Sequence, residues 1–555
     1  MKTVAIFGAG IAGLTVAHEL SDKGFQVHLY EKSKDVGGFA KSKRVNIPSQ
    51  EKTFPVEHSW RGYAPFYFNA FDVMKNIPCA EGSVYDNLTY PVHFLLPRDR
   101  MRSNPNKIGE PVLSAKDVTV LGYHISKVMF SSPKRRKEVY AKQSFKNILY
   151  PQLSQDGKDK IFGMIGPGLG LDLYTCSMYD VVKYAEMRFL TNHKPHMKYN
   201  RVGWHVMNAP TSEAWFDHWK KYLLEKGVNI YPNTELIDII THNSSIEACI
   251  IRNKGEVGYV HADDYILAIN PFNLRDIIRN NILLKKDVEL EKFEGLCADG
   301  EHKQIAFQIA LDKKVHFGKV FSNSTQETYA VAFPDSEFNI TLYPQDKQFS
   351  AQDLPTPGYW SGTACICTRP GRLYNLPALS CTKEQFIREV KHQIFRSEEF
   401  KMMIEKWNYP LTYKDFNITQ FIVYDEWKFP PCVRSATETE RKWVTTINTE
   451  RYRPGCKCEF DNLFLSGAHI TTSVSLWSME GAVESGKMAA NCVLEKYNAP
   501  LSGIHIHNSP KWMSAFHVPD SALYNMKAPH ILVICAIIIM IVMYVIYSYL
   551  KNTEK

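Results

Sequence analysis

Three glycines near the start of the chain have the spacing that allows a loop to bind a phosphate group. They are Gly8, Gly10 and Gly13. In this spacing the first glycine permits a tight turn, the second lets the main chain approach a pyrophosphate, and the third lets a helix pack closely on a strand. The N–H groups at the start of that helix then face the phosphates. Glu31, about 20 residues further along, has the acidic side chain that binds ribose hydroxyls.

The elements that would position these residues are a strand, a turn, a helix and a second strand. The apolar run 4–7 suits a buried parallel strand, and residues 11–20 suit a helix. The following run, FQVHLYEK at 25–32, indicates a second strand that ends in Glu31. This order of elements predicts the first part of a dinucleotide-binding α/β unit.

A second glycine pair and a motif far along the chain indicate which dinucleotide is bound. Gly37 and Gly38 stand in KDVGGFAKS, after the strand that carries Glu31, and SMEGAVESGK begins at Ser478. Together these motifs resemble those of FAD enzymes in the amine oxidase and phytoene desaturase superfamily. The resemblance covers most of residues 1–500 and implies FAD as the cofactor.

The closing motif of that superfamily consists of an apolar strand, a glycine, a loop and a helix, and it resembles residues 461–497 here. The resemblance implies cofactor contacts at Gly467, Met479, Glu480, Gly481 and Ala482. The partial positive charge at the start of the helix stabilises the anionic edge of a reduced flavin. The acid that usually follows the glycine and binds the ribityl chain is replaced by Ala468, with His469 next.

A segment midway along the chain resembles the returning strands of the same cofactor domain. In the superfamily, the residue aligned with Leu236 contacts the adenine side through its main chain. The fold expected is therefore α/β, with a Rossmann-like discontinuous FAD-binding domain, an inserted mixed α+β substrate domain and a C-terminal transmembrane helix. The expected FAD-binding parts are 1–64, 196–279 and 451–500. The other expected parts are a helical cap or substrate region at 65–195, a substrate domain at 280–450, a linker at 501–530 and the membrane helix at 531–550.

A polar and aromatic cluster, FPVEHSWRGYAPFY at 54–67, follows the first cofactor segment. In related enzymes this segment lines the active-site side of the flavin, so the resemblance makes Glu57, His58 and Arg61 catalytic candidates, with Trp60 and Tyr63 beside them. The alternative is that these residues tie the cap to the FAD domain. The superfamily often has Arg directly after the second glycine pair. Here Phe39 stands there, and Lys41 and Arg44 are the nearby cations.

The composition excludes several other classes of protein. The net charge of +8 and the pI near 8.7 are mildly basic, and KRRK at 134–137 is the longest basic tract, which argues against nucleic-acid binding. The 12 cysteines have no disulfide-framework spacing, so a reducing environment is expected. Two C-x-C pairs, at 365–367 and 456–458, lack a histidine at ligand spacing, so no metal site is predicted.

The segment 531–550, ILVICAIIIMIVMYVIYSYL, contains no charged residue. It has about the length that crosses a hydrocarbon core of about 30 Å as a helix. The sequence therefore predicts a single-pass C-terminal anchor, with the enzyme body facing the cytosol and the bilayer as a partner.

The favoured function is a membrane-anchored FAD-dependent oxidoreductase, a desaturase or dehydrogenase that transfers hydride from a lipophilic, polyisoprenoid-like substrate to flavin N5. Monoamine oxidases have an aromatic residue just before the M-E-G-A motif, where this chain has Ser478 and, one residue earlier, Trp477. A flavin-dependent amine oxidase remains the enzymatic alternative. A flavoprotein-fold membrane component without catalytic activity is the other.

Overall fold

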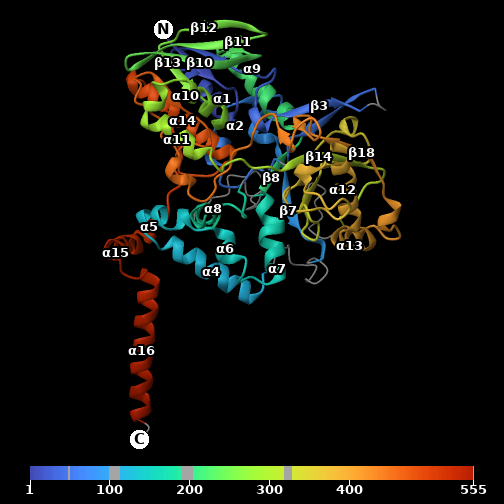
Figure 1. Ribbon diagram of the computed structural model, residues 1–555, viewed down its shortest axis with the longest axis vertical. Helices are drawn as coiled ribbons and strands as arrows, with labels where there is room; N and C mark the ends of the chain where they lie inside the picture. The colour runs from blue at the N-terminus through green and yellow to red at the C-terminus, as the bar shows by residue number, and fades with distance from the viewer. Residues whose placement is uncertain are drawn as a thin grey trace.

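Two large β-sheets, a layer of helices and a projecting C-terminal helix are the main parts of the computed structural model (Figure 1). The structure describes residues 1–47, 51–59, 61–98, 113–168, 171–189, 204–317 and 328–553. The candidate functional site lies where the two sheets meet, so their strands are described first.

The first sheet is parallel and has the strand order β21-β13-β1-β2-β9. Its strands are β1 (Lys2–Phe7), β2 (Phe25–Tyr30), β9 (Asn229–Tyr231), β13 (Asp264–Leu267) and β21 (Leu463–Leu465). The central strand β1 is buried from Val4 to Phe7, as expected for an apolar run covered on both faces. The strand order of the first sheet brings together segments that are more than 400 residues apart in the sequence.

Two long helices pack together beside this sheet. They are α1 (Ile11–Ser21) and α14 (Met479–Lys496). Gly486 makes their close approach possible, because a Cβ atom there would lie 2.6 Å from Thr15 Cβ and 2.7 Å from the Ala12 carbonyl oxygen. The two ends of the cofactor sequence pattern therefore form one packing unit.

An antiparallel meander and three helices complete this part of the molecule. The meander consists of β10 (Thr234–His242), β11 (Ser245–Asn253) and β12 (Glu256–Val260). The helices are α9 (Asp217–Glu225), α10 (Pro271–Asn280) and α11 (Val288–Leu296). These elements and the first sheet lie in the upper part of Figure 1.

The second sheet has seven strands in the order β18-β14-β17-β16-β15-β7-β8. They are β7 (Leu88–Leu95), β8 (Trp204–Met207), β14 (Ile305–Leu311), β15 (Thr328–Phe333), β16 (Ile340–Pro344), β17 (Gly358–Ala364) and β18 (Ile418–Val423). Helices α12 (Lys383–Arg396) and α13 (Glu398–Trp407) pack against it around a core of phenylalanines and aliphatic side chains. Two of its strands, β7 and β8, come from the ranges expected to be the helical cap and the second FAD segment.

Shorter elements connect the two sheets. The hairpin β3 (Ser42–Asn46) and β4 (Thr53–Glu57) is followed by α2 (Phe68–Lys75). Two-residue ladders are formed by β5 (Pro78–Cys79) with β6 (Gly82–Ser83), and by β19 (Trp427–Lys428) with β20 (Thr437–Glu438).

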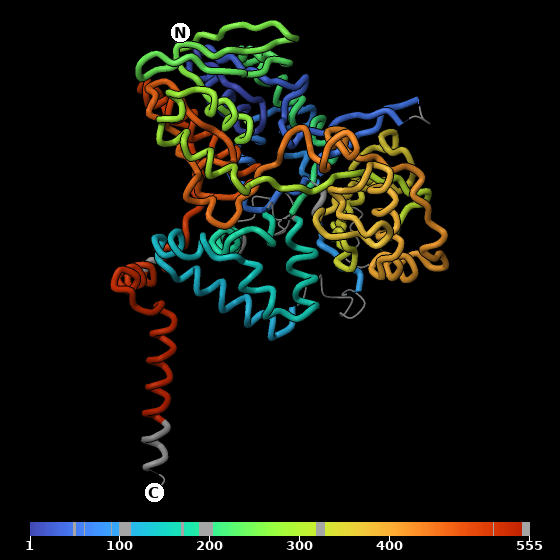
Figure 2. Tube along the Cα trace, in the orientation of Figure 1, coloured from blue at the N-terminus to red at the C-terminus, as the bar shows by residue number. Residues whose placement is uncertain are grey.

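A layer of helices lies on the side of the molecule from which the C-terminal helix extends. They are α4 (Ala115–Met129), α5 (Pro133–Glu138), α6 (Phe145–Leu149), α7 (Gln155–Lys158) and α8 (Met178–Phe189). Figure 2 shows them in light blue and teal, between the sheets and the red C-terminal segment.

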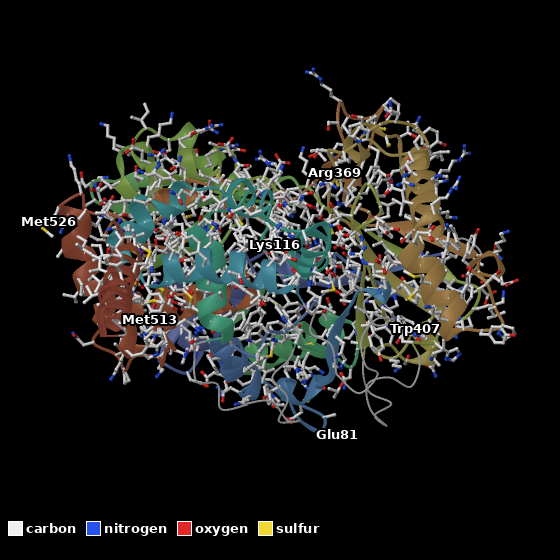
Figure 3. All side chains as sticks on the ribbon, turned by 90° about the horizontal axis from the view of Figure 1, so that it is seen from below. Glu81, Lys116, Arg369, Trp407, Met513 and Met526 are labelled. Carbon is white, nitrogen blue, oxygen red and sulfur yellow. The ribbon has the colours of Figure 1, made fainter. Side chains whose placement is uncertain are left out.

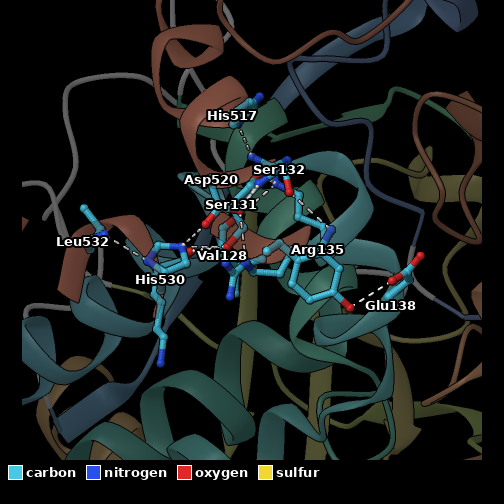
Figure 4. A network of polar contacts seen from close by, with 12 residues as sticks. Val128, Ser131, Ser132, Arg135, Glu138, His517, Asp520, His530 and Leu532 are labelled. Carbon is cyan, nitrogen blue, oxygen red and sulfur yellow. Dashed lines mark hydrogen bonds and ion pairs between the residues drawn. The ribbon is translucent and has the colours of Figure 1, made fainter. Parts of the chain in front are cut away.

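The C-terminal segment is attached to this layer by a network of polar contacts (Figure 4). Helix α15 (Ser514–Asn525) carries the buried Asp520, whose carboxylate accepts a hydrogen bond from the Ser132 main-chain N–H at 2.7 Å and pairs with Arg135 at 3.1 Å. The Nε2 atom of His530 lies 2.8 Å from Ser131 Oγ. Part of the KRRK tract is thus used to fix the segment that leads into the last helix.

The last helix, α16 (Ile531–Thr553), extends away from the body (Figure 1). Its described apolar side chains from Ile537 to Ile546 are 45–70% exposed. Among the residues that the structure describes, no helix is both long enough and apolar enough to cross a membrane. The transmembrane helix that the sequence predicts at 531–550 is therefore not supported by the described residues.

Candidate functional site

One large cavity, of about 800 Å³, extends from the glycine turns of the first sheet to the face of the second. The residues that line it come from every segment that the sequence assigned to the cofactor and from several that it did not. On the first-sheet side they include Gly8, Gly10, Glu31, Gly37 and Gly38. The cavity therefore begins where the dinucleotide motif predicts a phosphate site.

The two glycine turns lie back to back and form a narrow cradle. Gly8 has φ of +100° and Gly37 has φ of +109°, conformations that favour glycine. A Cβ atom on Gly38 would lie 3.1 Å from Gly10 Cα, whereas a Cβ on Gly10 itself would meet nothing closer than 3.9 Å. The space next to Gly10 is therefore open to a ligand, as a pyrophosphate requires.

Gly13 serves packing rather than ligand contact. It is buried in α1 and is not part of the cavity lining, and a Cβ there would lie 1.9 Å from the Gly8 carbonyl oxygen. This agrees with the packing role that its place in the motif indicates.

The acid at the end of the second strand is held in place by main-chain groups. Glu31 Oε2 accepts a hydrogen bond from the Ala9 N–H at 2.7 Å, and Oε1 accepts one from the Ser33 N–H at 2.8 Å. Leu236 also lines the cavity, from β10. Helix α10 adds Asn273 and Asp276, which sequence reasoning missed because nothing in their local pattern distinguishes them from an ordinary polar helix face.

The closing motif divides into residues that line the cavity and residues that do not. Gly467, Met479 and Ala482 line it, together with Ala468 and His469. Ser478 is the N-cap of α14, and its Oγ accepts a hydrogen bond from the Gly481 N–H at 3.1 Å. Burial lowers the pKa of His469 to about 3, so its ring is neutral at physiological pH.

Glu480 is buried in a different place from the one that the resemblance implies. It lies outside the cavity lining, and its carboxylate accepts hydrogen bonds from the Asn69 main-chain N–H (3.0 Å), Asn69 Nδ2 (2.9 Å) and the Ala70 N–H (2.9 Å). The Nε2 atom of His507 is 3.1 Å from the same carboxylate. The motif's acid thus ties α14 to the first turn of α2, and we infer a structural role for its side chain.

The three catalytic candidates are placed in different surroundings. His58 and Arg61 line the cavity, whereas Glu57 does not. Glu57 is buried and accepts hydrogen bonds from the main-chain N–H and the Oγ1 of Thr211, at 3.0 and 3.1 Å. Burial raises the pKa of Glu57 to about 6. For Glu57 the structure favours the alternative interpretation, in which the cluster ties two parts of the chain together.

His58 and Arg61 are each positioned by a specific contact. His58 Nε2 lies 2.5 Å from Glu438 Oε1, and its ring packs edge-on against Phe39 and Tyr424. Arg61 donates hydrogen bonds to the carbonyl oxygens of Phe39 and Ala40. The Arg61 guanidinium is therefore fixed against the segment that follows the second glycine pair.

The other residues of this cluster and the two nearby cations are also resolved by the structure, with one exception. Tyr63 is buried and its hydroxyl contacts Met207 Sδ at 3.5 Å, while Trp60 lies outside the described residues. Arg44 is paired with Glu213 and Asp353 outside the cavity lining. Lys41 is buried and, like Arg61, lines the cavity.

The second sheet provides the opposite wall of the cavity, which the sequence motifs did not reveal. Tyr343 (β16), Thr363 and Cys365 (at the end of β17) and Tyr424 line it. Lys442 also lines it, with Nζ 3.4 Å from Gln304 Oε1. Burial, reinforced by the charge of Arg61, lowers the pKa of Lys442 to about 8. No motif surrounds these residues, so only the pairing of the strands could have identified them.

Metal ligands form no cluster in the described part of the chain, where no group of three or more His, Cys, Asp or Glu side chains could hold a metal ion.

Comparisons with known proteins agree with this site. The model of the NAD(P)-binding Rossmann-like domain matches residues 6–77, and that of the flavin-containing amine oxidoreductases matches residues 398–494. These two segments thus match the first and last cofactor segments of the FAD-dependent amine oxidase and desaturase superfamily. The Rossmann-like α/β fold is thereby confirmed, and FAD is the cofactor of this flavoprotein.

Individual relatives are distant. The carotenoid phi-ring synthase of Chlorobaculum tepidum is 31% identical over 93 residues, which are 17% of this chain and 14% of that protein. An oxidoreductase of Methanosarcina mazei has a similar structure, with a TM-score of 0.54 at 14% identity over 89% of this chain and 100% of its own. A putrescine oxidase variant has a TM-score of 0.56 at 13% identity, over 89% of this chain and 99% of its own. At these identities the structural similarity establishes the fold alone.

Proposed function

We propose that this flavoprotein is a dehydrogenase or desaturase that oxidises a lipophilic, polyisoprenoid-like substrate. When bound, FAD accepts a hydride from the substrate. The glycine cradle, Glu31 and the main chain at Leu236 would hold the cofactor, together with Met479 and Ala482 at the start of α14. The second-sheet wall would hold the substrate next to it.

The observation that carries the proposal is a pair of basic side chains that line the cavity. Arg61 and Lys442 both line it, and each is close enough to the other for the charge of Arg61 to lower the pKa of Lys442. Two positive charges in a partly desolvated space disfavour the binding of a third positive charge, so a protonated amine binds poorly there. A neutral apolar substrate carries no such penalty, and the rings of Tyr343, Tyr424 and Trp477 offer it apolar surface.

Amine oxidation is the second candidate because Trp477 could replace the missing aromatic residue at Ser478. Trp477 lines the cavity and packs edge-on against Trp443 at 5.7 Å and Phe39 at 6.2 Å between ring centroids. The ring is thus held rigidly, as a wall of an amine site must be.

Anaerobic reduction of the FAD-loaded full chain separates these functions. We expect phytoene or squalene in detergent micelles to bleach the visible flavin absorption, and putrescine and benzylamine to leave it unchanged. Rapid bleaching by either amine would replace the first proposal with the second. If dithionite reduces the flavin but none of these compounds does, the non-catalytic interpretation is favoured.

We further propose that α16 buries its apolar side chains in a lipid bilayer and so keeps the body at the membrane, on the cytosolic side. Support comes from apolar residues close to the start of that helix, since Trp512, Val518 and Met526 are 53–71% exposed. Figure 3, viewed from below, shows Met526 and Lys116 on the face from which α16 extends. Exposed apolar residues suit a membrane interface.

Liposome flotation tests the membrane proposal. The full chain should float with vesicles of neutral and anionic phospholipid, and a chain ending at Lys527 should stay at the bottom with its flavin bound. Flotation of the shortened chain would show that the body itself binds lipid and would overturn the role given to α16.

A further inference from the structure

Three cysteines lie together at the far end of α14, away from the cavity. Cys492 is on the last turns of the helix, and Cys456 and Cys458 are on the chain that leads into β21. The Sγ atoms of Cys456 and Cys492 are 3.3 Å apart. A disulfide has an S–S bond of about 2.05 Å, so a movement of little more than 1 Å would join them.

The chemistry of the pair is asymmetric. The pKa of Cys492 is lowered, first because Cys456 hydrogen-bonds to its thiolate and second because the Lys457 ammonium is close. The pKa of Cys456 is raised, by its contact with Cys492 and by burial. Cys492 is therefore the thiol that ionises, and Cys456 keeps its proton. A thiolate is the form of cysteine that attacks an oxidant.

Access to solvent follows the same asymmetry. Cys492 is partly exposed, whereas Cys456 is only 7% exposed. A small oxidant can therefore reach the thiolate, while the partner thiol is shielded and lies next to it. This is the arrangement of an attacking and a resolving cysteine.

We propose that Cys456 and Cys492 are an oxidative modification site that hydrogen peroxide converts to a disulfide. The Cys492 thiolate attacks one peroxide oxygen, the O–O bond breaks, and sulfenic acid and hydroxide are formed. The Cys456 thiol then attacks the sulfenic sulfur, the S–S bond forms, and the sulfenic oxygen leaves as water. In total, two thiols and one hydrogen peroxide give one disulfide and two waters, with each sulfur oxidised by one electron.

The bond would join two elements that support the cofactor site. Helix α14 begins at the cavity, and the chain before Cys456 contains the buried Arg453. Arg453 donates hydrogen bonds to the carbonyl oxygens of Ala468, Ile470 and Ser475, at 3.0, 3.1 and 2.8 Å. The disulfide would therefore fix the helix against the segment that shapes one side of the flavin cavity.

Peptide mapping of the FAD-loaded full chain tests this proposal. After treatment with hydrogen peroxide and alkylation in denaturant, the thiol count should fall from 12 to 10, and one linked peptide should contain Cys456 and Cys492. Dithiothreitol should restore all 12 thiols. This measurement uses the wild-type chain, so it does not depend on any variant folding.

Three variants define the roles of the two sulfurs. Cys456→Ser should leave a sulfenic acid on Cys492 that dimedone traps, and Cys492→Ser should form neither product. Cys432→Ser is the matched control, because Cys432 is exposed and separate from the cluster, and it should leave the linkage unchanged. Absence of the 456–492 peptide while Cys432 is oxidised would overturn the proposal, as would a linkage of either residue to Cys458 instead.

Discussion

Replacing Glu480 by glutamine tests whether the acid of the closing motif supports the fold or contacts the flavin. The side chain is completely buried, and its carboxylate accepts three N–H hydrogen bonds from Asn69 and Ala70. Glutamine keeps one carbonyl oxygen but turns an NH₂ group toward one of these donors. The cavity lining does not include this side chain.

The magnitude follows from the contacts that are lost. A hydrogen bond to a charged group contributes about 1.5–3 kcal/mol, and a buried donor left without a partner costs about 1–3 kcal/mol. We therefore expect Glu480→Gln to lower the free energy of unfolding by about 3–5 kcal/mol. Unfolding entropy is about 2.1 cal/mol/K per residue, so for a body of roughly 500 residues the Tm should fall by about 3–5 °C if it unfolds as one unit.

Two measurements on the same variant decide between the roles. Thermal unfolding followed by circular dichroism should show the loss of stability with and without FAD, and the Kd for FAD should change by less than about twofold, since no cavity contact is lost. Ala482→Leu is the matched control, because Ala482 lines the cavity. It should weaken FAD binding and leave the Tm without FAD nearly unchanged. A large rise in Kd for Glu480→Gln with an unchanged Tm would refute the structural role.

Three other predictions follow from the cavity and from buried charges. Gly10→Ala should weaken FAD binding at least about tenfold with little change in the Tm of the FAD-free chain. Gly13→Ala should instead destabilise the fold, because its Cβ would lie 1.9 Å from a carbonyl oxygen. Flavin titration measures the first effect and thermal unfolding the second. Burial raises the pKa of Asp180 to about 7, so the folded chain keeps a proton that the unfolded chain releases near pH 4. The free energy of unfolding should therefore fall as the pH rises from about 4 to about 7. Asp180→Asn should flatten that fall in urea denaturation series at pH 5 and pH 8, and an unchanged slope would contradict the assignment. At pH 7, Lys442→Met should increase the affinity of the oxidised enzyme for putrescine severalfold. At pH 9 the increase should be much smaller, because the Lys442 side chain of the wild-type chain is already largely neutral there. Equal effects at both pH values would rule out charge repulsion.

Local sequence signals were sufficient for the first cofactor segment. The turn at Gly8, the helix after it and the acid at Glu31 depend on residues within one strand-turn-helix-strand unit, so a short stretch of sequence contains the information. The place of Gly13 under the first strand follows from the same local geometry.

Long-range contacts decided the rest. The motif predicts that Glu480 contacts the cofactor, as its neighbours Met479 and Ala482 are expected to do. Its actual partner, Asn69, is 411 residues away in the sequence. The wall formed by Tyr343, Thr363 and Cys365 depends on how β17 pairs with β16 on one side and with β14 on the other. The range that contains β7 was expected to be a helical cap, but β7 pairs with β15 and so brings Val92 next to Thr328. No local pattern carries such information.

The packing of α1 against α14 has a consequence for the synthesis of the chain. Nine of the 11 residues of α1 are buried in the finished protein, and Gly486 is the point of closest approach on the other helix. At a translation rate of about 5–20 residues per second, α1 leaves the ribosome roughly half a minute to a minute and a half before residue 486 is made. During that time the face of the first helix that packs on α14 has no permanent cover. The nascent flavoprotein is therefore expected to depend on chaperones that hold its N-terminal segment until translation is nearly complete, and its cofactor can be loaded only after that.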